Sequence, residues 1–203
     1  MEFCSAHPSV VRSVKQRDLL NVWLRLAPAG GAAAPSEAQF RPARFEEEKP
    51  DLVYYRILWE ADNPCIIINS DGSRVATAYG NGVNNKGRLL EEYLGPTTAA
   101  EVMPIYNECI RRARPVFTKS TVYDILGHRV YYERLLLPFS EGNAVTSIIA
   151  SLKWISGDGS FEIRNLFRSP DHKPELEILA LIDEAGLAGP LPGLDPATDF
   201  FEV

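Results

Sequence analysis

Cysteine side chains are the strongest nucleophiles in this 203-residue chain, and there are three of them, Cys4, Cys65 and Cys109. A cysteine that works with a histidine and a carboxylate can transfer acyl groups. The only such set that we can assemble is Cys109, His128 and Asp124. Its members come from separate expected elements, and no motif supports their convergence. We therefore expect no enzyme activity.

The same cysteines are odd in number and widely spaced, without a CxxC pair or a Cys/His pair at the spacing of metal ligands. This pattern argues against a zinc site and against a disulfide framework. We expect reduced thiols, with Cys65 and Cys109 packed as small hydrophobic residues. The glycine-rich segment 81–87 matches neither phosphate-binding nor dinucleotide-binding patterns, so we interpret it as a turn.

The composition is that of a globular protein, because 45% of the residues are hydrophobic and can form a core while 24% are charged. A net charge of −6 argues against a nucleic-acid partner. No apolar run approaches the roughly 18 residues of a membrane span, and the N-terminus lacks the order of a secretory signal. We therefore expect a cytoplasmic protein without a membrane partner.

Residues 8–26 place apolar side chains at helical spacing around a polar face, which predicts an amphipathic helix. The Gly, Pro and Ala residues of 27–35 predict a flexible connection. The helix can pack back on the domain or pair with a second copy, and the sequence leaves both open. Its bulky apolar face, which includes Trp23, leads us to expect a homodimer.

The stretch 63–80 predicts a β-hairpin with its turn at Ser70, Asp71 and Gly72. Residues 51–60 fit a helix and a strand equally well, and we favour a short helix. Short and longer helices are expected at 88–94 and from Thr98, the second interrupted by Pro104.

Three antiparallel strands are expected at 115–125, 129–139 and 144–155. The order of two strands, helices and three strands predicts an α+β fold, with an antiparallel sheet and helices on one face. In the C-terminal region, 174–185 reads as a short helix with an apolar stripe of Leu176, Leu179 and Ile182, and 189–203 is Pro-rich and acidic.

The segments NPCIIINSDG and YYERLLLPFSEGNAV, together with the helix DLLNVWLRL, resemble small stand-alone PAS proteins of alphaproteobacteria over about residues 17–156. The resemblance implies a five-stranded antiparallel sheet in the order 2-1-5-4-3, with helices across one face and often a ligand cavity beneath them. It divides the chain into an N-terminal helix and linker (1–36), a PAS-like domain (37–156) and a C-terminal tail (157–203).

PAS domains include flavin and haem sensors, but the residues here name no cofactor. The flavin photoreceptors have a cysteine in an Asn-Cys-Arg-Phe-Leu-like segment, where this chain has NKGRLL at 85–90. Haem sensors of this fold usually take a histidine from the long helix, and residues 98–114 contain none. The histidines are His7, His128 and His172.

We expect a non-catalytic sensory module that binds a small, largely apolar molecule and signals through protein contacts. Aromatic rings with polar tips suit such a pocket, which gives a set of candidate ligand-binding residues: Ile67, Tyr106, Cys109, Tyr123, Tyr132 and Trp154. The strand 129–139 carries one charge on each face, Arg134 and Glu133, so its pattern does not decide which face is buried.

An adaptor with a filled core and no ligand is the alternative function. It would bind a partner protein through the outer face of the sheet or through the stripe at 174–185.

Overall fold

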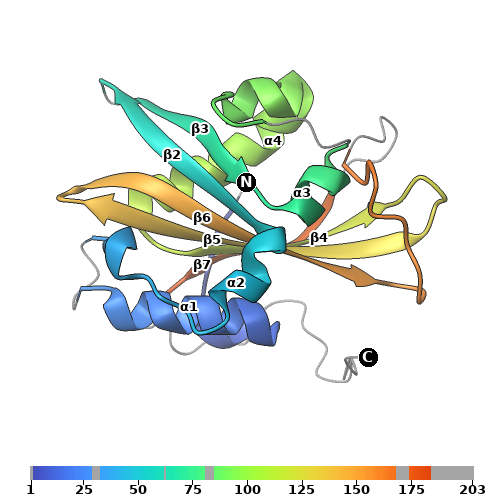
Figure 1. Cartoon of the computed structure of the whole chain (residues 1–203), viewed down its shortest axis with the longest axis horizontal. Coiled ribbons are helices and arrows are strands. Elements are labelled where there is room, and N and C mark those ends of the chain that lie inside the picture. The colour runs from blue at the N-terminus through green and yellow to red at the C-terminus, as the bar shows by residue number, and fades with distance from the viewer. Residues whose placement is uncertain (1, 29–32, 62, 81–84, 168–173, 184–203) are drawn as a thin grey trace.

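A seven-stranded sheet forms the centre of the computed structural model, which describes residues 2–28, 33–61, 63–80, 85–167 and 174–183 (Figure 1). The strand order is β1-β7-β4-β5-β6-β2-β3. Strand β1 runs parallel to β7, and all other neighbours are antiparallel. The strands are β1 (Cys4–Ala6), β2 (Leu52–Glu60), β3 (Asn63–Asp71), β4 (Val116–Tyr123), β5 (Arg129–Glu141), β6 (Ala144–Ser156) and β7 (Glu175–Ile182).

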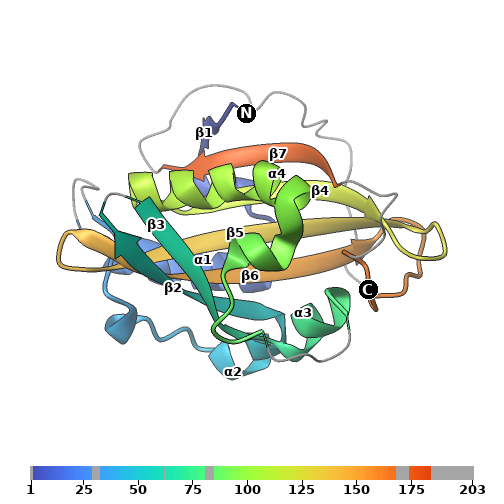
Figure 2. The same ribbon diagram turned by 90° about the horizontal axis from the view of Figure 1, so that it is seen from above.

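Helices cover both faces of the sheet, as the two views in Figures 1 and 2 show. The α-helices are α1 (Val14–Leu26), α2 (Phe45–Glu48), α3 (Ser73–Ala78) and α4 (Leu90–Arg112), and short 3-10 helices occupy Pro8–Val10, Glu37–Gln39 and Lys49–Asp51. Helix α1 lies across one face, while α4 crosses the other. The α+β fold expected from the sequence is present, but its sheet is mixed and has seven strands instead of five.

The first hairpin is formed by β2 and β3, so the expected hairpin with a turn at 70–72 is wrong. The expected short helix at 51–60 is strand β2, and the expected second strand at 73–79 is largely helix α3. Val53, Tyr55 and Ile57 alternate onto one buried face of β2, which is the pattern of a strand. The backbone at Gly72 passes very close to the backbone at Lys49. Only glycine fits there, because a Cβ would lie 2.3 Å from the carbonyl oxygen of Lys49.

Helix α1 packs against the protein's own sheet. Ser13 caps it by accepting the backbone N–H of Gln16. Leu19, Leu20 and Trp23 are fully buried, and the Trp23 indole N–H donates to the carbonyl oxygen of Pro138 at 2.6 Å. The apolar face that suggested a dimer is therefore covered within one chain, and the homodimer itself stays a prediction.

Helix α4 consists of two helical pieces that meet at Gly95, whose φ of 74° and ψ of 163° are not helical. Pro96 follows the break directly, where its missing N–H costs no hydrogen bond. Pro104 lies inside the second piece. This second piece places Tyr106 and Cys109 on the sheet, within one apolar cluster.

The segment expected to be a helix at 174–185 is a strand, and that expectation is wrong. Strand β7 pairs with β4 on one side and β1 on the other, which buries Leu179 and Ile182. Residues 178–182 are a continuous apolar run, and periodicity does not separate a strand buried on both faces from a helix in such a run. Strands from 1–36 and 157–203 thus join the same sheet as residues 37–156.

Candidate ligand-binding site

Arg134 lies in the middle of β5 with only 4% of its surface exposed. One guanidinium nitrogen donates to the hydroxyl of Tyr132 at 3.0 Å. The guanidinium carbon is 5.5 Å from the ring centroid of Tyr132 and 5.7 Å from that of Tyr106. No carboxylate within the described part of the chain forms an ion pair with Arg134.

The position of Arg134 follows from strand alternation. Tyr132 and Leu136 belong to the clusters on the side of α4, whereas Leu135 and Leu137 pack on the side of α1. Arg134 shares the parity of the first pair and therefore faces α4, and Glu133 faces α1. Both faces are covered by helices, which is why the pattern of the strand does not distinguish them.

Three tyrosines around Arg134, namely Tyr55, Tyr79 and Tyr106, are neutral at neutral pH. Burial raises the pKa of Tyr55, Tyr106 and Tyr79 above the ordinary value, and this effect outweighs the opposing influence of Arg134. Burial by itself lowers the pKa of Arg134, but the negative charge that the tyrosines acquire at high pH opposes this, so the pKa lies above its usual value. The site therefore holds one full positive charge among neutral hydroxyl groups.

Two further polar atoms on this face have no hydrogen-bond partner within the described residues. They are the hydroxyl oxygen of Thr118 and the indole nitrogen of Trp154, both fully shielded from solvent. Thr118 on β4 is the direct cross-strand partner of Arg134, and Trp154 on β6 is the partner of Tyr132. Three adjacent strands thus place hydrogen-bonding groups without a partner among the described residues at two successive levels of one sheet face, Thr118 beside Arg134 and Trp154 beside Tyr132.

Donors dominate this group. A guanidinium has five N–H donors and no acceptor, and an indole has one donor and no acceptor. A hydroxyl can donate or accept. The arrangement is therefore suited to a partner that supplies acceptors or negative charge, and an unpartnered buried cation is otherwise unfavourable.

Aromatic side chains enclose the same region. Tyr79 at the end of α3 lies 5.2 Å from Tyr93 and 4.6 Å from Phe167, measured between ring centroids. Phe167 also lies 5.0 Å from Tyr132. Tyr55 and Tyr106 pack edge to face at 5.3 Å, and the Tyr106 hydroxyl donates to that of Tyr55 at 3.2 Å.

The structure brings four of the six candidate ligand-binding residues to this side of the sheet. Tyr106 and Cys109 are buried on α4, and Tyr132 and Trp154 are cross-strand neighbours. Ile67 lies between Ile66 and Ile68, which are buried on the α4 side, so its side chain points to the opposite face. Tyr123 follows Val122 of the α4-side clusters and also lies on the opposite face.

Sequence reasoning did not select Arg134, Thr118, Tyr55 or Tyr79 for the site. A detectable signal was the position of Arg134 within YYERLLLPF, because a charged residue inside an apolar strand is unusual. Tyr55 was obscured by the expected helix at 51–60, and Tyr79 by the expected strand at 73–79.

Cys109, His128 and Asp124 occupy two different parts of the structure. Asp124 and His128 lie at the β4–β5 turn, whereas Cys109 lies in the core on α4. Asp124 accepts backbone N–H groups of Leu126, His128 and Glu162, each at 2.8 Å, and its carboxylate lies 3.1 Å from the His128 ring nitrogen. It therefore fixes the β4–β5 turn. Cys109 is fully buried in the apolar core, where burial raises the pKa of its thiol and keeps it protonated.

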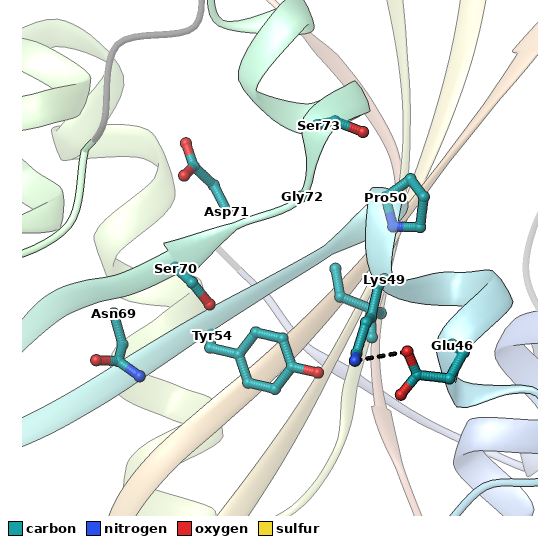
Figure 3. Close-up of a pocket in the computed structure, with 10 residues that line it drawn as sticks. Glu46, Lys49, Pro50, Tyr54, Asn69, Ser70, Asp71, Gly72 and Ser73 are labelled. Carbon is teal, nitrogen blue, oxygen red and sulfur yellow. Dashed lines mark hydrogen bonds and ion pairs between the residues drawn. The ribbon is translucent and has the colours of Figure 1, made fainter.

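An open groove of about 630 Å³ lies where the end of β3 passes the 3-10 helix Lys49–Asp51 (Figure 3). Its lining includes Tyr54, Asn69 and Asp71, and Lys49 there pairs with Glu46 at 2.6 Å. The side chains of this ion pair are largely exposed, and no buried unpartnered group lines the groove comparably to Arg134.

None of the protein-family models, curated proteins or solved structures with which we compared the chain gave a significant match. Among the described residues, no group of three or more His, Cys, Asp and Glu side chains is placed to hold a metal ion. The described helices also include none that is both long and apolar enough to cross a membrane.

Proposed function

We propose that the chain is a non-catalytic sensory module of the PAS type. It binds a small molecule between the sheet and α4, and passes on the change through contacts with other proteins. Strands β3, β2, β6, β5 and β4 are consecutive neighbours. Counted along the chain among themselves, they are the second, first, fifth, fourth and third strands, which supports the resemblance noted in the sequence.

Arg134 is the observation that carries the proposal. A protein that only needed a stable core would be better served by an apolar side chain at this position, since a buried charge without an ionic partner is costly. Functional sites are where such unfavourable groups are retained. The side chains of Thr118 and Trp154 also lack hydrogen-bond partners among the described residues, and we attribute this to the same ligand site.

Arg134→Met is the first test of the proposal. The substitution replaces the cation with an unbranched apolar side chain, and we expect the ligand-free protein to become more stable by about 1 kcal/mol or more. Arg56→Met is the matched control, because Arg56 is an exposed arginine on β2 of the same sheet, and it should change stability by less than about 0.5 kcal/mol. Urea unfolding monitored by circular dichroism measures both. A strong destabilisation by Arg134→Met would identify Arg134 as a structural residue and contradict the proposal.

Native mass spectrometry of the purified protein tests ligand binding directly. We expect an additional mass that is absent from the denatured sample and from Arg134→Met. A thermal-shift screen of small molecules extends the test to ligands that are lost during purification.

An adaptor with a filled core is the second candidate function. It is favoured by the ring contacts of Tyr55 with Tyr106 and of Tyr132 with Phe167, because these side chains occupy the space between sheet and helix themselves. No additional mass, a silent screen and a destabilised Arg134→Met would together favour this candidate over the sensor.

A further inference from the structure

We infer that the molecule bound between the sheet and α4 is a small monocarboxylate with an apolar body, and that its carboxylate pairs with the guanidinium of Arg134. This inference rests on the proposed function, and it adds the chemical class of the ligand. The sequence predicts a largely apolar ligand, and the inference adds one carboxylate group to it.

Charge is the first argument. Arg134 is 96% shielded from solvent and carries a full positive charge, and no carboxylate of the described residues pairs with it. A monoanion would neutralise the site. A neutral ligand would leave the guanidinium without an ionic partner, as it is now.

Geometry is the second argument. The planar fork of a guanidinium matches a carboxylate through two parallel N–H···O bonds. Within the described residues, the Arg134 guanidinium donates one hydrogen bond, to Tyr132. The unpartnered hydroxyl of Thr118, directly across from Arg134 on β4, is positioned to donate to a carboxylate oxygen held there.

The surroundings argue for a single charge and an apolar body. Arg134 is the only buried cation of the described residues, so a second carboxylate or a doubly charged phosphate would be buried without a cationic partner. The remaining walls are aromatic rings and aliphatic side chains, including Tyr106, Trp154 and Phe167. Such walls favour a hydrocarbon body over a polar one.

Binding requires some of the enclosing rings to move apart. The stack of Tyr79, Tyr93 and Phe167 is built from three chain segments outside the sheet, namely α3, the first piece of α4 and the segment after β6. Phe167→Ala removes one ring of this stack without touching Arg134 or Thr118. It should preserve the preference for acids over amides.

The test titrates the full-length protein with benzoate and hexanoate, and with the matched neutral amides benzamide and hexanamide. Isothermal titration calorimetry and thermal shift are the readouts. We expect at least one acid to bind at least about tenfold more tightly than its amide, which corresponds to the loss of one charge-assisted pair. Succinate and inorganic phosphate should bind more weakly than the preferred acid.

Three variants locate the binding. Arg134→Met should abolish binding of the acid, and Arg134→Lys should weaken it at least about tenfold, because lysine keeps the charge but loses the fork. Thr118→Val, which is isosteric, should weaken it about three- to tenfold through loss of one hydrogen bond. Arg56→Met should bind as the unaltered protein does. Circular dichroism of each variant establishes that it is folded.

The outcomes separate the inference from the proposed function. Equal binding of acid and amide, or undiminished binding by folded Arg134→Met and Thr118→Val, would overturn the inference. If the protein carries or binds a neutral molecule on this face while all acids fail, the ligand class is wrong and the sensory module survives. If neither acids nor neutral molecules bind, and nothing co-purifies, both are overturned.

Discussion

Two adjacent residues of β5 bury opposite charges on opposite faces of the sheet, and among the described residues Glu133 has charged groups of opposite sign acting on it. Glu133 is 7% exposed, and burial raises the pKa of its carboxyl group while the cations Lys153, Lys119 and Arg12 act to lower it. Arg134 lies beside the rings of Tyr106 and Tyr132 and has no carboxylate paired with it among the described residues. The difference explains why we place the ligand at Arg134 instead of on the α1 side.

Asp124 gives a prediction on pH dependence. Burial alone raises the pKa of its carboxyl group, but hydrogen bonds from the backbone of Glu162 and His128, the His128 ring and the backbone of Leu126 outweigh it and lower the pKa to about 2. A carboxyl group whose pKa is lower in the folded state stabilises the protein above its ordinary pKa of about 4 and loses this effect as the pH falls to about 2.

We expect Asp124→Ala to be less stable than the unaltered protein by about 1–3 kcal/mol at pH 7, with the difference shrinking between about pH 4 and pH 2. Thermal unfolding across this pH range measures it. Asp158→Ala, an exposed carboxylate after β6, is the control and should show little difference. A difference that stays constant down to pH 2 would mean that the charge of Asp124 does not stabilise the turn.

For single residues, the sequence predicts which side-chain types suit a ligand site better than it predicts the face of the sheet on which each side chain lies. Tyr106, Tyr132 and Trp154 were chosen for their polar tips and do lie on one side of the sheet. Ile67 and Tyr123 belong to the same candidate set, but strand alternation directs them to the other face. The sequence does not predict which face Arg134 occupies, because a pattern with one charge on each side contains no information about which side is covered.

At the scale of elements, β7 yields the sharpest prediction. Leu179 is 7% exposed and pairs across the ladder with Thr118, whereas Leu176 on the same strand is 42% exposed. Leu179→Asp buries an unpaired carboxylate, and we expect a loss of about 3 kcal/mol or more, or an insoluble protein. Leu176→Asp is the matched control and should cost less than about 1 kcal/mol.

Urea unfolding of the two variants is the measurement. Similar stability of both proteins would show that β7 does not contribute to the sheet in solution. The result also bears on the adaptor, because the stripe expected to bind a partner at 174–185 instead completes the protein's own sheet.

Segments rich in β-branched and aromatic residues and separated by turn residues were predicted well. The strands expected at 115–125, 129–139 and 144–155 correspond closely to β4, β5 and β6. The failures were dense apolar runs: 51–60 and 174–185 have no readable period, so their state depends on the strands that they join. The Asp-Gly signal at 71–72 marked a backbone crossing, which local turn chemistry does not distinguish from a hairpin.

At the scale of the whole molecule, the N-terminal segment is part of the core. Deletion of residues 1–26 removes β1 and α1, including the fully buried side chains of Leu19, Leu20 and Trp23. We expect a chain that fails to fold or aggregates, since each buried large side chain contributes roughly 1.5–3 kcal/mol against a typical total of 5–15 kcal/mol.

Circular dichroism and light scattering measure the effect, with a chain lacking residues 1–2 as the control. A folded protein of unchanged size after the longer deletion would contradict the packing of α1. For the full-length protein, light scattering at tens of micromolar tests the predicted homodimer, whose interface can no longer be the apolar face of α1.

The parallel pairing of β1 with β7 has a consequence for how the chain folds. Residues 4–6 are synthesised long before residues 180–182, with which they pair at the edge of the sheet. Strand β7 must first dock on β4 before β1 has a place to pair. The contacts of β1 therefore close one of the longest loops in the protein, which slows folding because loop closure precedes the gain from pairing. A nascent chain released before residue 175 would leave the edge of β4 open to pairing with other chains.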